Sequence, residues 1–289
     1  MIRQIFQLVI LLGCMLQSAS TLAQDFQGKA YYFSKTTMDL SQWTRGRQIS
    51  EQQKKQMMER MRPWLEKTYI LTFNKEESIY KEDEKLEAPG SGRGISMWGN
   101  SFSAGPQYKN VKTKTFLQDQ EFFGKKFLIT EELEPLEWKM SSESKKIGNY
   151  TCFKATALKP STDVNWLRRS RRNSEAEKKS DSTNTEKENK ETVETEEEEV
   201  EMIEVVAWYT PQIPVNQGPG EYWGLPGLIL EVSAGNVTML CSKIVLNPEE
   251  KEDIDKPKKG DVVTKSEYNK IITERMEQMR ANRGRGRRY

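Results

Sequence analysis

The segment from Ile213 to Glu231 constrains the backbone more than any other part of the chain. It contains four glycines and three prolines. Each proline fixes its φ angle and lacks an amide donor, and the residue before a proline is pushed towards an extended conformation. Residues 228–230 follow as an uncharged apolar run, which is typical of a strand buried on both faces. The segment therefore predicts an ordered loop that leads into the most buried strand of the fold.

Residues 224–229 spell GLPGLI, and this string resembles the signature of the GLPGLI family of secreted bacterial proteins. Upstream, residues 138–155 are similar to the family block that begins with tryptophan and continues to a Tyr-x-Cys-x-Lys-Ala pattern. Residues 206–210 resemble the strand that follows it, so the resemblance covers most of residues 26–246. The family has no established activity. The resemblance therefore implies an envelope protein of a Gram-negative bacterium and brings no catalytic residues with it.

Residues 1–23 are expected to form a signal peptide. Arg3 precedes an apolar run, and small residues lead to a cleavage point after Ala23. The apolar run is too short to cross a bilayer as a retained helix. We therefore expect an exported protein of the periplasm or the outer membrane surface, and lipid attachment at Cys14 is the alternative.

Composition divides the remaining chain into a domain, an insertion, a helix and a tail. Residues 24–162 and 200–262 contain short alternating segments and predict a single β-rich domain. Residues 163–199 are almost without apolar side chains, so they are expected to be a disordered charged insertion that cannot offset its ordering entropy. Residues 264–281 have the spacing of an amphipathic helix. The basic tail at 282–289 is expected to be solvated, with contact to an anionic membrane surface as the alternative.

A helix is predicted from about Glu51 to Met61, because Ser50 and Gln53 match a capping box. Pro63 should break this helix. Together, the short strands, hairpin connections and two helices predict a β-rich α+β fold. We expect an antiparallel and strongly curved sheet, similar in outline to a half-barrel, with the first helix covering one face and the second at the C-terminal end.

The first helix carries a methionine cluster. Met57, Met58 and Met61 recur at helical spacing and are expected to face the core, where methionine fills irregular gaps. Three thioethers are also suitable ligands for Cu(I), which is the alternative for this group.

Two connections between strands are predicted from polarity and turn residues. Residues 109–117 are expected to form one strand that pairs with residues 126–132 through a turn near Gly124. Residues 142–148 are polar and are expected to connect two strands rather than to belong to one.

Cys152 and Cys241 remain once the signal peptide is removed, and both lie in predicted strands. In an oxidising compartment an even pair of cysteines predicts one disulfide. Two buried free thiols are the alternative.

The chain contains no histidine. This excludes Ser-His-Asp and Cys-His catalysis and the usual zinc sites. Carboxylate pairs of the glycosidase kind remain possible, but no two carboxylates stand out. The 45 basic and 43 acidic residues nearly balance and do not favour nucleic acid as a partner. We therefore expect a non-enzymatic protein without a cofactor.

Four aromatic residues are the candidates for binding. Tyr222 and Trp223 lie in the glycine- and proline-rich segment, Trp98 lies in a long loop at 87–107, and Trp208 lies on a predicted strand. Aromatic side chains commonly provide binding contacts, so we expect these four to bind an envelope protein or another ligand, and Trp223→Ala to leave the fold intact. An apolar ligand or lipid in the cavity of a half-barrel is the alternative function. Packing of the loop against the sheet is the alternative role for Tyr222 and Trp223.

Overall fold

The structure is a computed structural model that describes residues 26–38, 50–83, 104–160, 202–250 and 252–285. From residue 280 onwards it describes the backbone alone.

Several predictions concern residues outside these ranges. They are the signal peptide with Cys14, the loop residue Trp98, the charged insertion at 163–199 and the last residues of the basic tail. These remain predictions.

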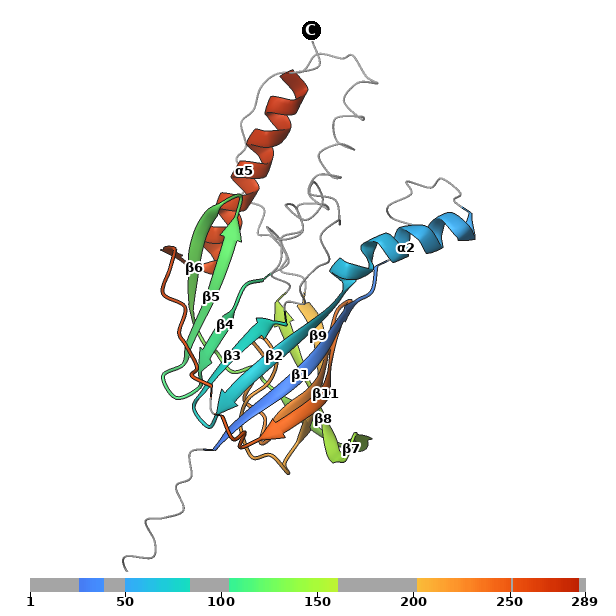
Figure 1. Cartoon of the computed structure of the whole chain (residues 1–289), viewed down its shortest axis with the longest axis vertical. Helices are drawn as coiled ribbons and strands as arrows, with labels where there is room; N and C mark the ends of the chain where they lie inside the picture. The colour runs from blue at the N-terminus through green and yellow to red at the C-terminus, as the bar shows by residue number, and fades with distance from the viewer. Residues whose placement is uncertain (1–25, 39–49, 84–103, 161–201, 251, 286–289) are drawn as a thin grey trace, which may run out of the picture.

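The described residues form one twelve-stranded sheet and two helices, as expected for a β-rich α+β fold (Figure 1). The strand order is β12-β6-β5-β4-β3-β2-β1-β11-β10-β9-β8-β7, and the two ends of the sheet are not joined. Neighbouring strands are antiparallel, except that β12 pairs in parallel with β6. In chain order the strands are β1 (Gln27–Thr36), β2 (Glu66–Asn74), β3 (Glu77–Glu82), β4 (Gln107–Asn110), β5 (Thr115–Phe122), β6 (Lys125–Glu132), β7 (Lys139–Ile147), β8 (Tyr150–Pro160), β9 (Met202–Thr210), β10 (Leu228–Ala234), β11 (Val237–Leu246) and β12 (Asp261–Val263).

The glycine- and proline-rich segment is an ordered loop without helix or strand, as predicted, and we call residues 211–227 the crossing loop. Ile213 and Val215 of this loop are at most 2% exposed and belong to the same core cluster as Tyr32 of β1. The Tyr32 hydroxyl donates a 2.6 Å hydrogen bond to the carbonyl of Ile229. The crossing loop therefore packs on one face of the sheet and completes its core.

The C-terminal helix α5 (Lys265–Arg285) packs on the strands at one end of the sheet (Figure 1). Thr264 and Glu267 form a reciprocal cap at its start: the Thr264 amide donates to the Glu267 carboxylate at 2.8 Å, and the Glu267 amide donates to the Thr264 hydroxyl at 3.2 Å. The buried residues of α5 are Tyr268, Ile272 and Met276, which pack against Phe122, Phe127 and Ile129 of β5 and β6.

The helix α2 (Glu51–Leu65) does not cover a face of the sheet, which corrects the expected architecture. Figure 1 shows it projecting away from the strands, and Leu65 is its one buried residue. The helix also continues past Pro63, because the proline lies in the last turn and disturbs only the end of the hydrogen-bond ladder. The predicted capping box at Ser50 is confirmed.

The methionine cluster on α2 is consequently not part of the core. Met58 is 38% exposed, and Met57 and Met61 are half-buried. This corrects the expectation that the three side chains face the sheet. Cu(I) binding by the three thioethers remains an untested alternative.

Two strand boundaries differ from the prediction. The segment expected as one strand at 109–117 is divided between β4 and β5 by a turn, because the Asn110 side chain accepts hydrogen bonds from the amides of Lys112 and Thr113. The polar residues expected as a connection at 142–147 instead extend β7 up to the turn at Gly148. Their polarity fits β7 because it is an edge strand whose side chains are mostly exposed.

Cys152 on β8 and Cys241 on β11 are buried free thiols, which corrects the expected disulfide. The strands β9 and β10 lie between β8 and β11 in the sheet. Each thiol donates to a carbonyl of its own strand, Cys152 to Tyr150 at 3.8 Å and Cys241 to Lys243 at 3.6 Å. Burial raises the pKa of Cys152 to about 11 and that of Cys241 to about 12, so the reactive thiolate form is disfavoured at neutral pH.

Gly227, at the end of the crossing loop, lies where the neighbouring backbone leaves no room for a side chain. A Cβ atom there would lie 2.1 Å from the carbonyl oxygen of Thr210, which is backbone and cannot rotate away. Gly235, in the turn between β10 and β11, has a φ of +57° but no atom within 4 Å of the corresponding position.

We predict that Gly227→Ala destabilises the protein by about 3 kcal/mol or more, because overpacking adds to backbone strain. Gly235→Ala is the matched control and should cost only about 1–2 kcal/mol for its left-handed conformation. Urea denaturation measures both free energies of unfolding. Equal losses would show that the crossing loop can move away from Thr210.

Candidate binding pocket

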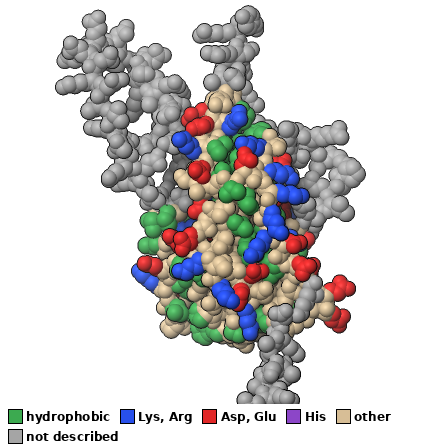
Figure 2. All heavy atoms as spheres, turned by 90° about the vertical axis from the view of Figure 1, so that its left-hand side faces the viewer, with side chains coloured by type: hydrophobic (Ala, Val, Ile, Leu, Met, Phe, Trp, Pro, Cys, Tyr) green, Lys and Arg blue, Asp and Glu red, His purple; other side chains and the backbone are tan. Residues whose placement is uncertain are grey.

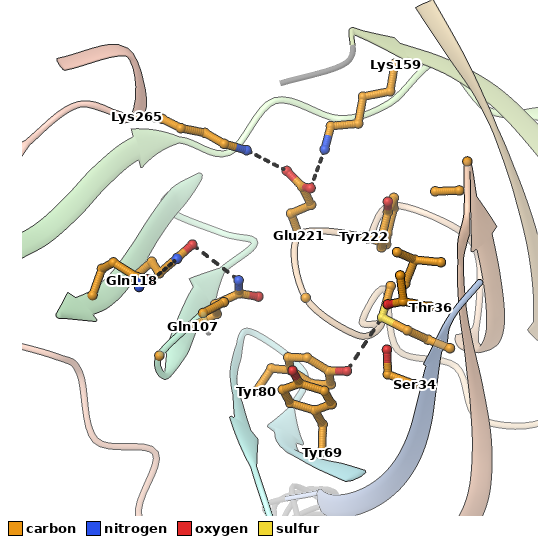
Figure 3. A pocket seen from close by; sticks show the side chains of 18 of the residues that line it. Ser34, Thr36, Tyr69, Tyr80, Gln107, Gln118, Lys159, Glu221, Tyr222 and Lys265 are labelled. Atoms are coloured by element: carbon orange, nitrogen blue, oxygen red, sulfur yellow. Dashed lines mark hydrogen bonds and ion pairs between the residues drawn. The ribbon is translucent and has the colours of Figure 1, made fainter. Parts of the chain in front are cut away.

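A cavity of about 590 Å³ opens where the crossing loop, the sheet and the start of α5 meet (Figure 3). It is lined by residues of the strands β1 to β5, β8 and β9, of the β10–β11 turn, and of α5. Its polar lining consists of three charged side chains, five carboxamides, four tyrosines and two aliphatic hydroxyls: Lys159, Glu221 and Lys265; Gln107, Gln118, Gln120, Asn236 and Asn269; Tyr69, Tyr80, Tyr222 and Tyr268; Ser34 and Thr36.

Glu221 lies at the centre of the charged group, between Lys159 of β8 and Lys265 of α5 (Figure 3). Its Oε1 atom accepts a hydrogen bond from Lys159 Nζ, and its Oε2 atom is 3.7 Å from Lys265 Nζ. Burial raises the pKa of Glu221, but the ammonium groups of Lys265, Lys159 and Lys109 outweigh this effect and hold the pKa below its ordinary value. The carboxylate therefore stays ionised at neutral pH.

Lys109 of β4 lies beneath this group and is fully buried. Its Nζ atom donates hydrogen bonds to the carbonyls of Gly218 at 2.7 Å and Tyr222 at 2.8 Å. Burial lowers the pKa of Lys109 to about 7, and the nearby Glu221 carboxylate opposes this shift. The side chain joins the middle of the sheet to both ends of the short turn that carries Glu221.

One wall of the pocket is a ladder of glutamine side chains. Gln107 of β4 donates to Gln118 of β5 at 3.2 Å, and Gln118 donates to Gln120 at 2.9 Å. Gln120 in turn shares a side-chain hydrogen bond with Tyr268 of α5. Because Gln118 and Gln120 are two positions apart in a strand, they lie on the same face of the sheet.

Another part of the pocket wall is aromatic. The rings of Tyr69 and Tyr80 stack with centroids 4.7 Å apart and an interplanar angle of 12°. The Tyr80 hydroxyl contacts Met239 Sδ at 3.5 Å (Figure 3). Tyr222 faces the pocket from the crossing loop, and Lys159 Nζ lies 5.7 Å from the centre of its ring.

The structure separates the aromatic residues that the sequence suggested as one site. Tyr222 lines the pocket, whereas Trp223 and Trp208 do not. Trp223 is buried against β5, with its indole N–H donating to the Glu134 carbonyl at 3.3 Å. Trp208 on β9 is half-buried, and Lys145 Nζ lies 4.3 Å from the centre of its ring.

The charged and amide residues of the pocket were missed by sequence reasoning. A weak signal existed for the glutamines, because Gln118 and Gln120 alternate with other residues within one strand. Glu221 also interrupts an otherwise uncharged loop. No local pattern connects these positions with Lys159 or Lys265. Across the described part of the chain, no group of three or more Cys, Asp or Glu side chains is arranged to hold a metal ion.

Comparison with known proteins finds one family. Residues 138–231 match a family described as a protein of unknown function (Porph_ging), and this range includes the GLPGLI string. No curated protein matches the chain.

Two solved structures of PNGF-II are distantly similar. The structure in space group C2 has a TM-score of 0.45 and 13% identity, covering 86% of this chain and 32% of that chain. The structure in space group P21 has a TM-score of 0.39 and 13% identity, covering 78% of this chain and 29% of that chain. The chain thus spans about a third of the length of PNGF-II.

Lys109 should make the stability of the protein depend on pH. The ordinary lysine pKa is about 10.4, so above pH 7 the unfolded chain keeps a proton that the folded protein has released. The free energy of unfolding should therefore rise with pH above about 7, by up to about 1.4 kcal/mol per pH unit. Lys109→Met retains an unbranched apolar side chain and should lack this contribution.

The measurement is urea denaturation of wild type and variant between about pH 6.5 and 7.5, below the range in which unfolded cysteine and tyrosine lose protons. The difference between the two slopes isolates Lys109 from other groups. Parallel slopes would mean that the Lys109 amine keeps its proton in the folded protein.

Trp223→Ala should destabilise the protein by about 3–5 kcal/mol, because it removes a buried indole and its hydrogen bond. Trp64→Ala is the control: Trp64 on α2 is 42% exposed, and its loss should change the stability by no more than about 0.5 kcal/mol. Thermal and urea denaturation give both values. A Trp223→Ala protein of unchanged stability that has lost binding would restore the earlier expectation that Trp223 is a contact residue.

Proposed function

We propose that this is a non-enzymatic binding protein that acts outside the cytoplasm and holds a polar ligand, or a short polar segment of an envelope protein, in the 590 Å³ pocket. The observation that carries the proposal is the convergence of Glu221, two lysines and a ladder of amides in one concave site. Ligand sites are typically concavities of about 300–1,000 Å³ with a few well-placed polar groups.

A polar ligand is favoured over an apolar one because the crossing loop occupies the apolar interior. This loop reaches Phe116 of β5 through Trp223, and Ala155 of β8 belongs to the same core cluster as its residue Leu225. We propose that the sheet curves strongly around the loop, in the manner of a half-barrel, because one short segment contacts strands near both ends of the order. Such a half-barrel is filled by the protein itself. The alternative of a lipid carrier therefore receives less support than binding in the polar pocket.

Binding is also favoured over catalysis. A general base works best when its pKa lies near the operating pH, but the surrounding lysines lower the pKa of Glu221. The Lys109 amine has a pKa of about 7, but it is fully buried and is hydrogen-bonded to two backbone carbonyls. Neither group is placed to exchange a proton with a bound molecule.

Export and envelope localisation belong to the same proposal and rest on the N-terminal sequence. We also propose that the matched domain of unknown function and the GLPGLI family are related, since the matched residues 138–231 contain residues 224–229. Among the described residues, no helix is long and apolar enough to cross a membrane. Contact of the basic tail with anionic lipid headgroups remains a proposal for 282–289.

Nucleic acid is not the proposed partner. On the face seen in Figure 2, basic and acidic side chains are interspersed rather than gathered by sign. Lys125 and Asp261, for example, form a 2.9 Å ion pair between β6 and β12. A continuous basic surface, which nucleic-acid binding needs, is not present on this face.

Filling the pocket should abolish binding without harming the fold. Ser34 of β1 lines the pocket, whereas its neighbour Lys35 is exposed on the opposite face of the strand. We expect native mass spectrometry of the wild type, after incubation with a small-molecule extract of the cell envelope, to show a bound component. Ser34→Trp should lose this component, and Lys35→Trp should retain it. Equal behaviour of the two variants would place the ligand elsewhere.

A further inference from the structure

Lys265, at the start of α5, has hydrogen-bond donors that the described part of the protein leaves unused. Its Nζ atom is 3.7 Å from Glu221 Oε2, too far for a hydrogen bond. Within the described part of the chain, this ion pair is its one side-chain interaction, and its side chain is 36% exposed. An ammonium group has three hydrogen-bond donors. Lys265 can therefore donate to an oxygen atom of a ligand without breaking an existing hydrogen bond.

The second lysine of the pocket is held differently. Lys159 donates to Glu221 Oε1, lies near the Tyr222 ring and is only 13% exposed at its side chain. It therefore fixes the carboxylate in place, and this leaves Lys265 as the accessible cation. The backbone amide of Lys265 donates to the Glu131 carboxylate at 2.5 Å, which anchors the residue while its side chain faces the pocket.

The charge balance of the pocket favours an anion. Of the charged side chains that line it, two are lysines and one is a glutamate, so one positive charge is in excess. An isolated charge in a partly buried site is costly unless it is paired. A ligand carboxylate beside Lys265 would restore neutrality.

The amide wall sets the rest of the ligand chemistry. Each glutamine has two N–H donors and a carbonyl oxygen with two lone pairs, and the mutual hydrogen bonds of Gln107 and Gln118 use only part of the capacity of these two side chains. Its mutual hydrogen bonds hold the side chains in one orientation, which reduces the entropy lost on binding. Hydroxyl or amide groups of a ligand match such a wall, and an apolar surface does not.

We propose that the pocket takes a small carboxylate-bearing ligand, whose acid group pairs with Lys265 and whose hydroxyl or amide groups lie against the glutamine ladder. This proposal rests on the proposed function and names the ligand class of the same site. Two sources share this chemistry, an acidic saccharide and the carboxyl end of a short peptide.

Four probes test whether a carboxylate is required and whether it belongs to a saccharide or to a peptide. They are a disaccharide of glucuronic acid, the corresponding disaccharide of glucose, N-acetylated trialanine with a free carboxylate, and the same peptide as its C-terminal amide. Isothermal titration calorimetry at low salt should show that at least one acid binds ten-fold or more tightly than its neutral counterpart, the range of one charged hydrogen bond. The acid that binds identifies the source.

Lys265→Gln tests the role of the ammonium group and keeps a good helix former at this position. It should weaken binding of the acid about ten- to a hundred-fold and leave the neutral probe unchanged. Lys270→Gln is the matched control, because it removes the same charge from an exposed position of the same helix that does not line the pocket. Glu221→Gln removes the competing carboxylate and should strengthen binding of the acid.

Other outcomes overturn the ligand class. If neither acid binds better than its neutral partner, or if Lys265→Gln and Lys270→Gln behave alike, the carboxylate assignment is wrong. If Lys265→Gln strengthens binding and Glu221→Gln abolishes it, the ligand is a cation and not an anion. None of these results refutes the pocket itself, because the Ser34→Trp comparison with envelope extract judges the proposed function independently of the probes.

Discussion

The arrangement of the molecule depends on one buried side chain, that of Lys109. Its Nζ atom contacts two carbonyls that are four residues apart in the crossing loop, and so closes the turn between Gly218 and Tyr222 around itself. This contact fixes where the loop crosses the sheet. It also decides that Glu221 faces the pocket, while Trp223, two residues further, faces β5. A buried amine is costly in a core, and here the cost is offset by a loop held in one conformation.

The crossing loop both fills the core beside the sheet and forms part of the pocket wall. Its apolar side chains fill the space along the sheet that a carrier protein would leave for a ligand, as the near-complete burial of Ile213, Val215 and Leu225 shows. The pocket lies beside the turn held by Lys109, and charged, amide and aromatic side chains contribute to its lining. The glycine- and proline-rich segment therefore acts mainly as packing, and only Gly220, Glu221 and Tyr222 of this segment line the pocket.

The charged group around Glu221 illustrates how the site and the fold share the same interactions. Lys159 and Lys265 come from β8 and α5, so the carboxylate joins the sheet, the loop and the C-terminal helix at one point. Partly buried ion pairs of this kind contribute little net stability once their desolvation is counted. Their geometry places the Lys265 ammonium group beside the pocket, 3.7 Å from Glu221 Oε2. The glutamine ladder also positions its side chains through mutual contacts, because each hydrogen bond orients the next side chain.

The sequence by itself determined the local features: the cap at Ser50, the turn near Gly124, the β-rich character and an ordered loop rich in glycine and proline. These depend on steric and hydrogen-bonding rules that act within a few residues. Only the tertiary structure decided that α2 leaves the sheet, that the two buried cysteines are free thiols, and that Glu221 meets lysines 62 positions earlier and 44 later in the chain. No local pattern specifies such pairs, because ion pairs and burial depend on which distant segments the folded backbone brings together.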